Sequence, residues 1–314
     1  MEFTPVPRGT IDVFEPYAAA LSGPIESFVE GHLLASDAFR IAIDGVSAGS
    51  FAVENGTLLT NFHMSGAARR HARRALAAIF EAHPITTALV PTCDEFMLCQ
   101  LLDREHVLHL QAYFFGEAVP GTADSAPPAA LSYRPAVASD VAAIEAVSGD
   151  FLDRLPERVA AGEVHVGHDE SSESRRSGGS GGSGGSGELV AVGIAEPGRL
   201  LTDYASIGMF TAASRRRSGI GTATLRYLRN RCHAHGVTPI AGCWYGNHAS
   251  RHTLEAAGMV TTARLLRFEF PMPSADSNSH HIGGTRHDGT DSDGTESDGT
   301  DSDGTEGEDA GSEE

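Results

Sequence analysis

Apolar and polar positions alternate along the chain in two blocks, and both blocks predict the same succession of elements. Each begins with a pair of strands in which apolar and polar residues alternate. An Ala- and Arg-rich helix, an apolar strand, a shorter helix and a last strand follow. In the first block these elements are predicted at residues 40–44, 50–53, 67–82, 85–90, 94–104 and 107–115, and in the second at 164–166, 189–192, 221–235, 239–244, 249–257 and 261–270.

A shared hexapeptide indicates that the two blocks are copies of one unit. Gly56–Asn61 has the sequence GTLLTN and Gly198–Asp203 has the sequence GRLLTD, at an offset of 142 residues. The hexapeptide lies between the strand pair and the long helix in both blocks, so the shared order is β-β-β-α-β-α-β. A match in sequence together with a match in element order predicts tandem copies of an α/β unit.

Composition along the chain predicts where the domains begin and end. A stretch rich in Pro, Gly and Ala at 119–131 predicts domains at 1–120 and 131–273, joined by a linker at 121–130. A run rich in Gly and Ser at 171–187 lies between two strand-like segments. We therefore interpret that run as an enlarged hairpin loop inside the second domain rather than as an interdomain linker.

The last residues, 274–314, form an acidic low-complexity tail. A DGT[DE][SG] pentad occurs four times from Asp288 onward, without apolar side chains that folding could bury. Such a composition cannot compensate the entropy lost on ordering, so a disordered tail is expected. The pentad is also similar to acidic calcium loops. A calcium loop, however, needs a bidentate Glu at a fixed distance and flanking structure, and the tail has neither.

The charge of the chain is concentrated in this tail. The chain has 42 Asp plus Glu and 23 Lys plus Arg, a net charge of −19. Residues 275–314 contain 13 acidic residues and one Arg, so they account for −12 and the remaining chain for −7. A body with net negative charge argues against a protein that binds nucleic acid by neutralising phosphates.

The basic and sulfur-containing residues bear on the environment of the protein. All 23 basic residues are Arg, and an acidic protein without Lys resembles haloarchaeal proteins, which stay soluble in high salt. No segment approaches the ~18 apolar residues of a membrane span, and the N-terminus lacks the pattern of a signal peptide. Four Cys residues without a CxxC pair favour reduced thiols. We expect a cytoplasmic protein without a membrane partner.

A glycine-containing turn is the clearest candidate for a ligand site. A predicted strand at 205–211 is followed by Arg215–Gly221, with the sequence RRRSGIG, and then directly by the long helix. The first N–H groups of a helix lack partners within the helix, and together with the helix dipole they can bind phosphate oxygens. Two glycines let an anion approach closely, and the Arg side chains can add charge-assisted contacts. This fragment alone is equally compatible with an ordinary basic helix start.

Motifs in the second block resemble those of the GNAT acyltransferase superfamily. Arg216-x-x-Gly219-x-Gly221 fits the loop of this family. Asn247-x-x-Ser250 with Glu255 and Gly258-Met259 is similar to its Asn-x-x-Ser…Glu-x-x-Gly-Phe motif, with Met in place of Phe. Tyr133-Arg-Pro-Ala136 with Ser139-Asp140 resembles the first strand and the start of the first helix of the family. The resemblance covers about 131–273.

The resemblance implies two tandem GNAT-like α/β domains, each a mixed, mostly antiparallel sheet flanked by helices, and an acetyl-CoA site in the second. In the family, loop N–H groups hold the pyrophosphate, and the pantetheine arm lies in a V-shaped opening between two central strands, here 205–211 and 239–245. A strand N–H polarises the thioester carbonyl. The implied cofactor-binding residues are Met209, Phe210, Thr211, Arg216, Arg217, Ser218, Gly219, Ile220, Gly221, Thr222, Asn247 and Ser250.

The implied reaction transfers an acetyl group from acetyl-CoA to a small-molecule or peptide amine, by direct attack in a ternary complex. The amine must lose a proton before it attacks. The family often uses a Glu on the strand before the loop, but Asp203 is the nearest carboxylate here. The family also often places a Tyr where Leu254 stands, so Tyr245 and Tyr204 are the substitutes. The missing groups favour an alternative, a non-catalytic acyl-CoA-binding or regulatory protein.

The first block departs further from the family. Arg73 and Ala75 occupy the positions of the glycine pair, and Pro91–Asp94 stands where the Asn-x-x-Ser motif would begin. We predict that this block keeps the fold without a standard cofactor loop, packs against the second block and shapes the acceptor site.

Two further interpretations compete with these. His248 and His252 have a spacing that can bind metal, but no third ligand is evident, so we expect a polar helix face and no metal. Cys243 lies on a strand of the proposed opening, where packing is the simpler role.

The third functional class is an interaction protein whose acidic tail recruits a basic partner.

Overall fold

Each half of the described chain folds into ten elements in the same order, β-α-α-β-β-β-α-β-α-β. The computed structural model describes residues 1–121, 131–149, 151–171 and 187–271. The first half contains β1 (Glu2–Pro5), α1 (Glu15–Ala18), α2 (Ser27–Ala35), β2 (Asp37–Ile43), β3 (Val46–Glu54), β4 (Leu58–Met64), α3 (Ala72–Ala82), β5 (Thr87–Pro91), α4 (Glu95–Leu102) and β6 (Val107–Glu117). The second contains β7 (Leu131–Pro135), α5 (Val141–Ser148), α6 (Leu155–Ala160), β8 (Val164–Asp169), β9 (Glu188–Pro197), β10 (Tyr204–Thr211), α7 (Ile220–Ala234), β11 (Thr238–Trp244), α8 (His248–Ala256) and β12 (Met259–Glu269).

The predicted order β-β-β-α-β-α-β is confirmed in both halves. The sequence missed α1, α2 and α6, which have 4, 9 and 6 residues. Helices this short span only one to two and a half turns, so they carry little apolar periodicity. Short 3₁₀ helices precede α3, α5 and α7, at Gly66–His71 (η1), Ala138–Asp140 (η2) and Ala213–Arg215 (η4).

The strands form one mixed sheet of twelve, in the order β1-β2-β3-β4-β5-β12-β6-β11-β10-β9-β8-β7. Among the pairs within the described residues, β4–β5 and β10–β11 are parallel and the others are antiparallel. The expectation of mostly antiparallel sheets flanked by helices is confirmed, with the two expected sheets continuous as one.

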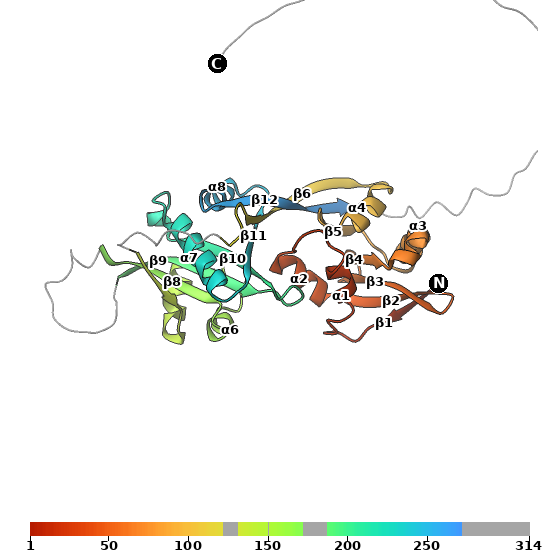
Figure 1. The fold of residues 1–314 in the computed structure, drawn as a ribbon, viewed down its shortest axis with the longest axis horizontal. Helices are drawn as coiled ribbons and strands as arrows, with labels where there is room; N and C mark the ends of the chain where they lie inside the picture. Colours follow the sequence, from red (N-terminus) through yellow and green to blue (C-terminus); the bar gives the residue numbers. More distant parts are fainter. Residues whose placement is uncertain (122–130, 150, 172–186, 272–314) are drawn as a thin grey trace, which may run out of the picture. The chain divides into compact units, whose positions relative to one another are not determined.

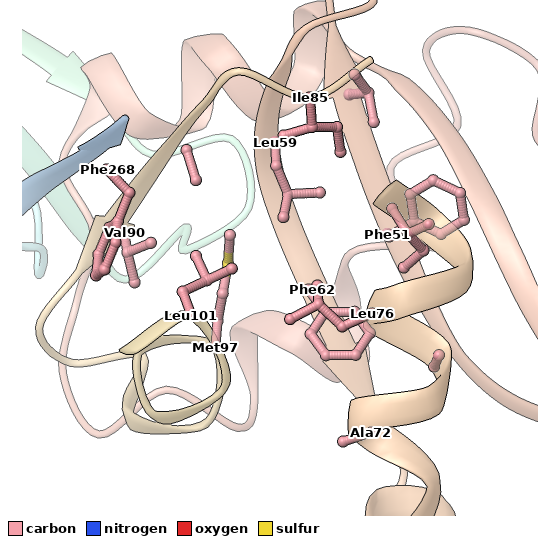
Figure 2. Close-up of a cluster of buried hydrophobic side chains, with 14 of the residues drawn as sticks. Phe51, Leu59, Phe62, Ala72, Leu76, Ile85, Val90, Met97, Leu101 and Phe268 are labelled. Carbon is pink, nitrogen blue, oxygen red and sulfur yellow. The ribbon is translucent and has the colours of Figure 1, made fainter. Parts of the chain in front are cut away.

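The last strand of each half pairs with the other half. β12 lies between β5 and β6, and β6 lies between β12 and β11 (Figure 1). Figure 2 shows the consequence in the core of the first half, where Phe268 of β12 packs among Phe62, Leu101 and other side chains of that half. The halves therefore share a core as well as a sheet, and residues Met1–Met272 form one compact unit.

Most residues at the predicted domain boundaries lie outside the part of the chain that the structure describes. β8 and β9 pair antiparallel up to Asp169 and Glu188, so the Gly- and Ser-rich run joins two strands of one hairpin, as predicted. Residues 172–186 of that run, residues 122–130 of the predicted linker and the tail from 272 onward lie outside the described residues. The division at 120 and 131 stays a prediction. None of the helices in the described segments has the length and apolarity that crossing a membrane requires.

A buried ion pair connects β6 with α7. The Glu117 carboxylate accepts hydrogen bonds from Arg229 at 2.9 Å and from His233 at 3.0 Å. The Glu117 and Arg229 side chains are 2% and 4% exposed. Burial acts to raise the pKa of Glu117, but these hydrogen bonds outweigh it and hold the pKa below its usual value. The first half thereby fixes the helix that follows the candidate loop of the second.

Candidate functional site

The parallel strands β10 and β11 separate after a short paired stretch. They pair only where Tyr204–Ser206 faces Thr238–Ile240. Beyond this point β10 remains paired with β9 as far as Thr211, whereas β11 pairs with β6. Alternate backbone groups on the inner edge of β10 therefore face a gap rather than a neighbouring strand.

The loop that leaves β10 ends in a left-handed glycine at the start of α7. Gly219 has φ +82°, a conformation that favours glycine over residues with a Cβ. The N–H of Ala223 is the first to bond within the helix, to the Gly219 carbonyl at 3.0 Å. The N–H groups of Ile220, Gly221 and Thr222 precede it, so they lie at the unsatisfied positive end of the helix.

Side chains around this loop are tightly arranged. A Cβ on Gly221 would lie 3.1 Å from Thr253 Cγ2 and 3.2 Å from Met209 Sδ, which leaves no room for a larger residue. The Arg216 guanidinium lies 5.4 Å from the centre of the Phe210 ring. Ser218 turns away from the gap, because its hydroxyl donates to the Arg215 carbonyl at 2.5 Å.

A cavity of about 880 Å³ extends from the open end of β10 past the loop to α8. It brings together ten residues that the sequence predicted for cofactor binding. These are Met209, Phe210, Thr211, Arg216, Arg217, Gly219, Gly221, Thr222, Asn247 and Ser250. Ser218 and Ile220 do not line it: Ser218 is exposed, and the Ile220 side chain is buried in a small cluster with Val190 and Ala191.

The sequence missed one wall of this cavity, which is a face of α8. Ala249, His252, Thr253 and Ala256 line the cavity together with Ser250. Their spacing of three, four and seven residues is that of one helix face, so the pattern was available once Asn247 was recognised as the helix start. Asn247 itself is the N-cap, since its Oδ1 accepts the N–H of Ser250 at 3.0 Å.

The structure does not bring the two predicted catalytic residues to this cavity. Asp203 is exposed at the paired end of β10, and its carbonyl accepts the Thr238 N–H at 2.8 Å. The Tyr245 ring stacks on Tyr113, with centroids 5.1 Å apart. Leu254 is buried in the core behind β11. No described side chain supplies the expected acid or base from these positions.

A second cavity, of about 570 Å³, lies where the two halves meet. It is lined by α2 and the end of β3 from the first half, and by α6 and the end of β9 from the second. Its lining residues are Glu26, Ser27, Phe28, Gly31, His32, Glu54, Phe151, Leu152, Asp153, Arg154, Arg158, Ile194, Glu196 and Arg199. Phe151 lines both cavities, so the two spaces meet at this side chain.

Related ion pairs line the second cavity on its two sides. Glu54 and Glu196 end the equivalent strands β3 and β9, at the 142-residue offset of the repeat. Glu54 pairs with His32 of α2, and Glu196 pairs with Arg158 of α6 at 3.1 Å. The repeat therefore surrounds the cavity with corresponding carboxylates, each in contact with a side chain from the helix of its own half.

The remaining candidates are inert in the described geometry. Burial raises the pKa of the Cys243 thiol to about 11, which makes it a poor nucleophile at neutral pH. Across residues 1–121, 131–149, 151–171 and 187–271, no three His, Cys, Asp or Glu side chains cluster as metal ligands would.

One known family model matches a segment of the first half. Residues 10–118 match the model of an acetyltransferase (GNAT) domain. The match thus covers about a third of the chain, in the half without the glycine loop. No curated protein sequence matches the chain.

Solved structures show the same fold over most of the chain. An acetyltransferase of the GNAT family from Colwellia psychrerythraea superposes with a TM-score of 0.70 at 16% identity, covering 86% of this chain and all of that one. A tandem GNAT protein from the clavulanic acid biosynthesis pathway, solved without AcCoA, has a TM-score of 0.53 at 12% identity, with 85% and 97% covered. A GCN5-related N-acetyltransferase from Sphaerobacter thermophilus gives 0.52 at 14%, with 85% and 94% covered. The chain has the tandem GNAT fold, and the family match indicates an acyltransferase.

Proposed function

We propose that the chain transfers an acetyl group from acetyl-CoA to an amine, by direct attack in a ternary complex. The observation that carries the proposal is the 880 Å³ cavity, which extends from the open end of β10 to the free N–H groups at the start of α7. A ligand with an extended arm and a phosphate end has the shape and charge that this cavity accommodates.

The loop would hold the pyrophosphate of the cofactor. The N–H groups of Ile220, Gly221 and Thr222 point out of the helix end, where negative charge is stabilised. Arg216 and Arg217 line the same end of the cavity and can donate charge-assisted hydrogen bonds to phosphate oxygens. An absence of Lys from the chain means that any side-chain cation in this role is Arg.

The gap between the strands would hold the pantetheine arm and the thioester. Met209, Phe210 and Thr211 are half-buried at the open end of β10 and line the cavity. An N–H on the inner edge of β10 can donate to the thioester oxygen and stabilise the charge that develops when the amine attacks. The amine would enter from the second cavity, which meets the first at Phe151.

The direct test is calorimetric titration of acetyl-CoA into the full chain at high salt. Gly219→Asp adds a carboxylate at the anion site and a side chain at φ +82°, and we expect it to lower the affinity at least ~100-fold. Gly236→Asp is the matched control, because Gly236 has φ +72°, with open space around it and no place in the cavity. Unchanged binding by Gly219→Asp, or no binding by the wild type, contradicts the proposal.

The second candidate is a protein that binds acyl-CoA without turning it over. The placement of Asp203 and Tyr245 outside both cavities favours it. Thiol release from acetyl-CoA, measured with glycine, spermidine, glucosamine and a peptide with a free N-terminus, separates the candidates. Release that depends on the amine supports the transferase, whereas tight binding without release supports the second candidate.

A further inference from the structure

Glu26 of the first half reaches the point where the strands of the second half separate. It immediately precedes α2, and its side chain lies against β11. The position that a Cβ on Gly242 would occupy is 3.0 Å from Glu26 Cδ and 3.2 Å from Oε2. Gly242 is the second residue of β11 beyond the last one paired with β10. The carboxyl group therefore lies against β11 where this strand is no longer paired with β10, in space that a side chain on β11 would otherwise fill.

A hydrogen bond between the halves fixes the backbone beside Glu26. The N–H of Ser27 donates to Ser206 Oγ at 2.8 Å, and Ser206 is the last residue of β10 that pairs with β11. One turn later, Glu30 accepts hydrogen bonds from the N–H groups of Arg199, Leu200 and Leu201 at 2.7, 3.1 and 3.0 Å. The start of α2 is thus anchored to the strand and loop that border the gap.

The surroundings leave Glu26 without a compensating cation. Burial and the negative charges of Glu196 and Glu30 raise its pKa to about 7, against the opposing effect of one hydrogen bond from the Phe28 N–H. Within the described part of the chain no ion pair involves Glu26.

The other charged groups of the cavity are paired or lie at its exposed rim. His32 pairs with Glu54, and Arg158 pairs with Asp153 and Glu196. Arg154 and Arg199 are exposed. Glu26 is the carboxyl group that remains to receive a positively charged ligand.

We propose that the cavity between the halves is the acceptor site for a cationic primary amine, and that Glu26 is the general base of the transfer. This inference rests on the proposed function. The first half then contributes the proton acceptor that β10 lacks, so the reacting groups come from both copies of the repeat.

The chemistry follows from this placement. An alkyl amine enters as an ammonium ion, and the Glu26 carboxylate attracts it and takes one N–H proton. The nitrogen lone pair then attacks the thioester carbon, a C–N bond forms, and the C–S bond breaks as the thiolate leaves. The thiolate takes the second proton from nitrogen, which yields the amide and the free thiol. Glu26 returns its proton to water through the open side of the cavity.

Glu26 also has a structural role, which the test must separate. Its carboxylate accepts the Phe28 N–H at 3.2 Å as the N-cap of α2. Glu26→Gln keeps an acceptor oxygen for this cap and removes only the basicity. Glu81→Gln is the matched control, since Glu81 is an exposed Glu on α3, away from both cavities.

The experiment measures kcat/KM against pH, acetyl-CoA affinity and melting temperature for the wild type and both variants, with the best amine of the panel above. For Glu26→Gln we expect a loss of about 100-fold or more at pH 7 and no rising limb near pH 7. Its acetyl-CoA affinity and melting temperature should stay near the wild-type values, and Glu81→Gln should match the wild type throughout.

The outcomes separate the two proposals. An active wild type with an equally active Glu26→Gln, or a variant that keeps the rising limb, overturns the role of Glu26 alone. A wild type that does not bind acetyl-CoA contradicts the proposed function. A wild type that binds acetyl-CoA and releases no thiol with any amine of the panel overturns both the transfer and its base.

Discussion

The two halves have the same splayed pair of parallel strands, but the side chains at the open ends of the two pairs differ. In the second half, Met209–Thr211 at the open end of β10 are half-buried. In the first half, the corresponding end of β4 is closed, and Phe62 and Met64 are fully buried. The backbone geometry is repeated, and the side chains decide whether the opening can accept a ligand.

The helix that follows each opening shows how one residue position decides whether the space there is filled. Asp94 caps α4 and Asn247 caps α8, each by accepting an N–H three residues later. The second residue after the cap is Phe96 in α4 and Ala249 in α8. Phe96 stacks on Phe62 with centroids 5.6 Å apart, whereas Ala249 lines the cavity. An aromatic residue fills in one half the space that a methyl group leaves open in the other.

The loops that precede α3 and α7 also differ between the two halves. Gly66–His71 forms a 3₁₀ helix before α3, and the Arg69 guanidinium lies 4.8 Å from the centre of the Phe96 ring. The second half has Gly219 in the left-handed conformation at the same place. The first half therefore directs its Arg onto its own core, and the second directs Arg216 and Arg217 to a cavity. Repetition of a fold need not repeat its binding site.

The largest expected effect concerns the dependence of one half on the other. Glu117→Ala leaves Arg229 buried without its carboxylate partner, which should lower the free energy of unfolding by about 3–5 kcal/mol. Because β6 and β12 are exchanged, we expect one cooperative transition that shifts as a whole in chemical denaturation. Glu269→Gln, at an exposed carboxylate of β12, is the control. Two separate transitions, with only one shifted, would show that the halves unfold independently.

The next prediction converts the open half into a copy of the closed one. Ala249→Phe places an aromatic ring where Phe96 lies in the first half, and should weaken acetyl-CoA binding at least ~100-fold, about 3 kcal/mol. Ala234→Phe is the control, because Ala234 is exposed at the end of α7. Calorimetry measures both variants, and wild-type affinity in Ala249→Phe would rule out the cavity as the cofactor site.

The smallest effect compares the two helix caps as pH changes. Burial raises the pKa of the Asp94 carboxyl group from its usual value of 3.8 to about 7. The folded state therefore holds this proton more tightly than the unfolded state, and stability that is present below pH 4 is lost as the pH rises through 7. Asp94→Asn gives the first half the neutral cap of the second and removes this loss.

The quantity of interest is the free energy of unfolding of Asp94→Asn minus that of the wild type. We expect this difference to increase by about 2 kcal/mol between pH 4 and pH 8. About three units of pKa set an upper limit near 4 kcal/mol, and the buried amide N–H₂ needs partners that a carboxylate does not. Urea denaturation of both proteins from pH 4 to pH 8 measures this difference. Glu26 also has a raised pKa, but it is present in both proteins, so its contribution to the pH dependence cancels. A difference that does not change with pH would show that Asp94 is not buried as a neutral acid.

Local motifs made the geometry of the candidate loop predictable from the sequence. Gly219, Gly221 and Asn247 lie within one strand-loop-helix-strand-helix unit, so their spacing along the chain determines their spacing in the fold. The repeat was predictable from the element order, whereas the shared hexapeptide runs into β4 (Leu58–Met64) in the first half and precedes β10 (Tyr204–Thr211) in the second. The face of α8 was also within reach, through the helical spacing of Ala249, Thr253 and Ala256.

Contacts between the halves could not be predicted in this way. Ser27 and Ser206 are 179 residues apart, and nothing in the pattern around Glu26 indicates that it lies against β11. The exchange of β6 and β12 was equally hidden, since both strands have the same length and each can pair with either neighbour. Asp203 was predicted because it is close in sequence to the strand, whereas Glu26, which lies against β11, comes from the other half.

The measurement that tests the central claim most directly is the stoichiometry of acetyl-CoA binding to the full chain. Two copies of one fold could hold two cofactors, but Phe62, Met64 and Phe96 fill the corresponding space in the first half. Calorimetry should therefore give one acetyl-CoA per wild-type chain and none bound to Ala249→Phe at the same concentrations. Two molecules per chain, or one that survives Ala249→Phe, would contradict the account.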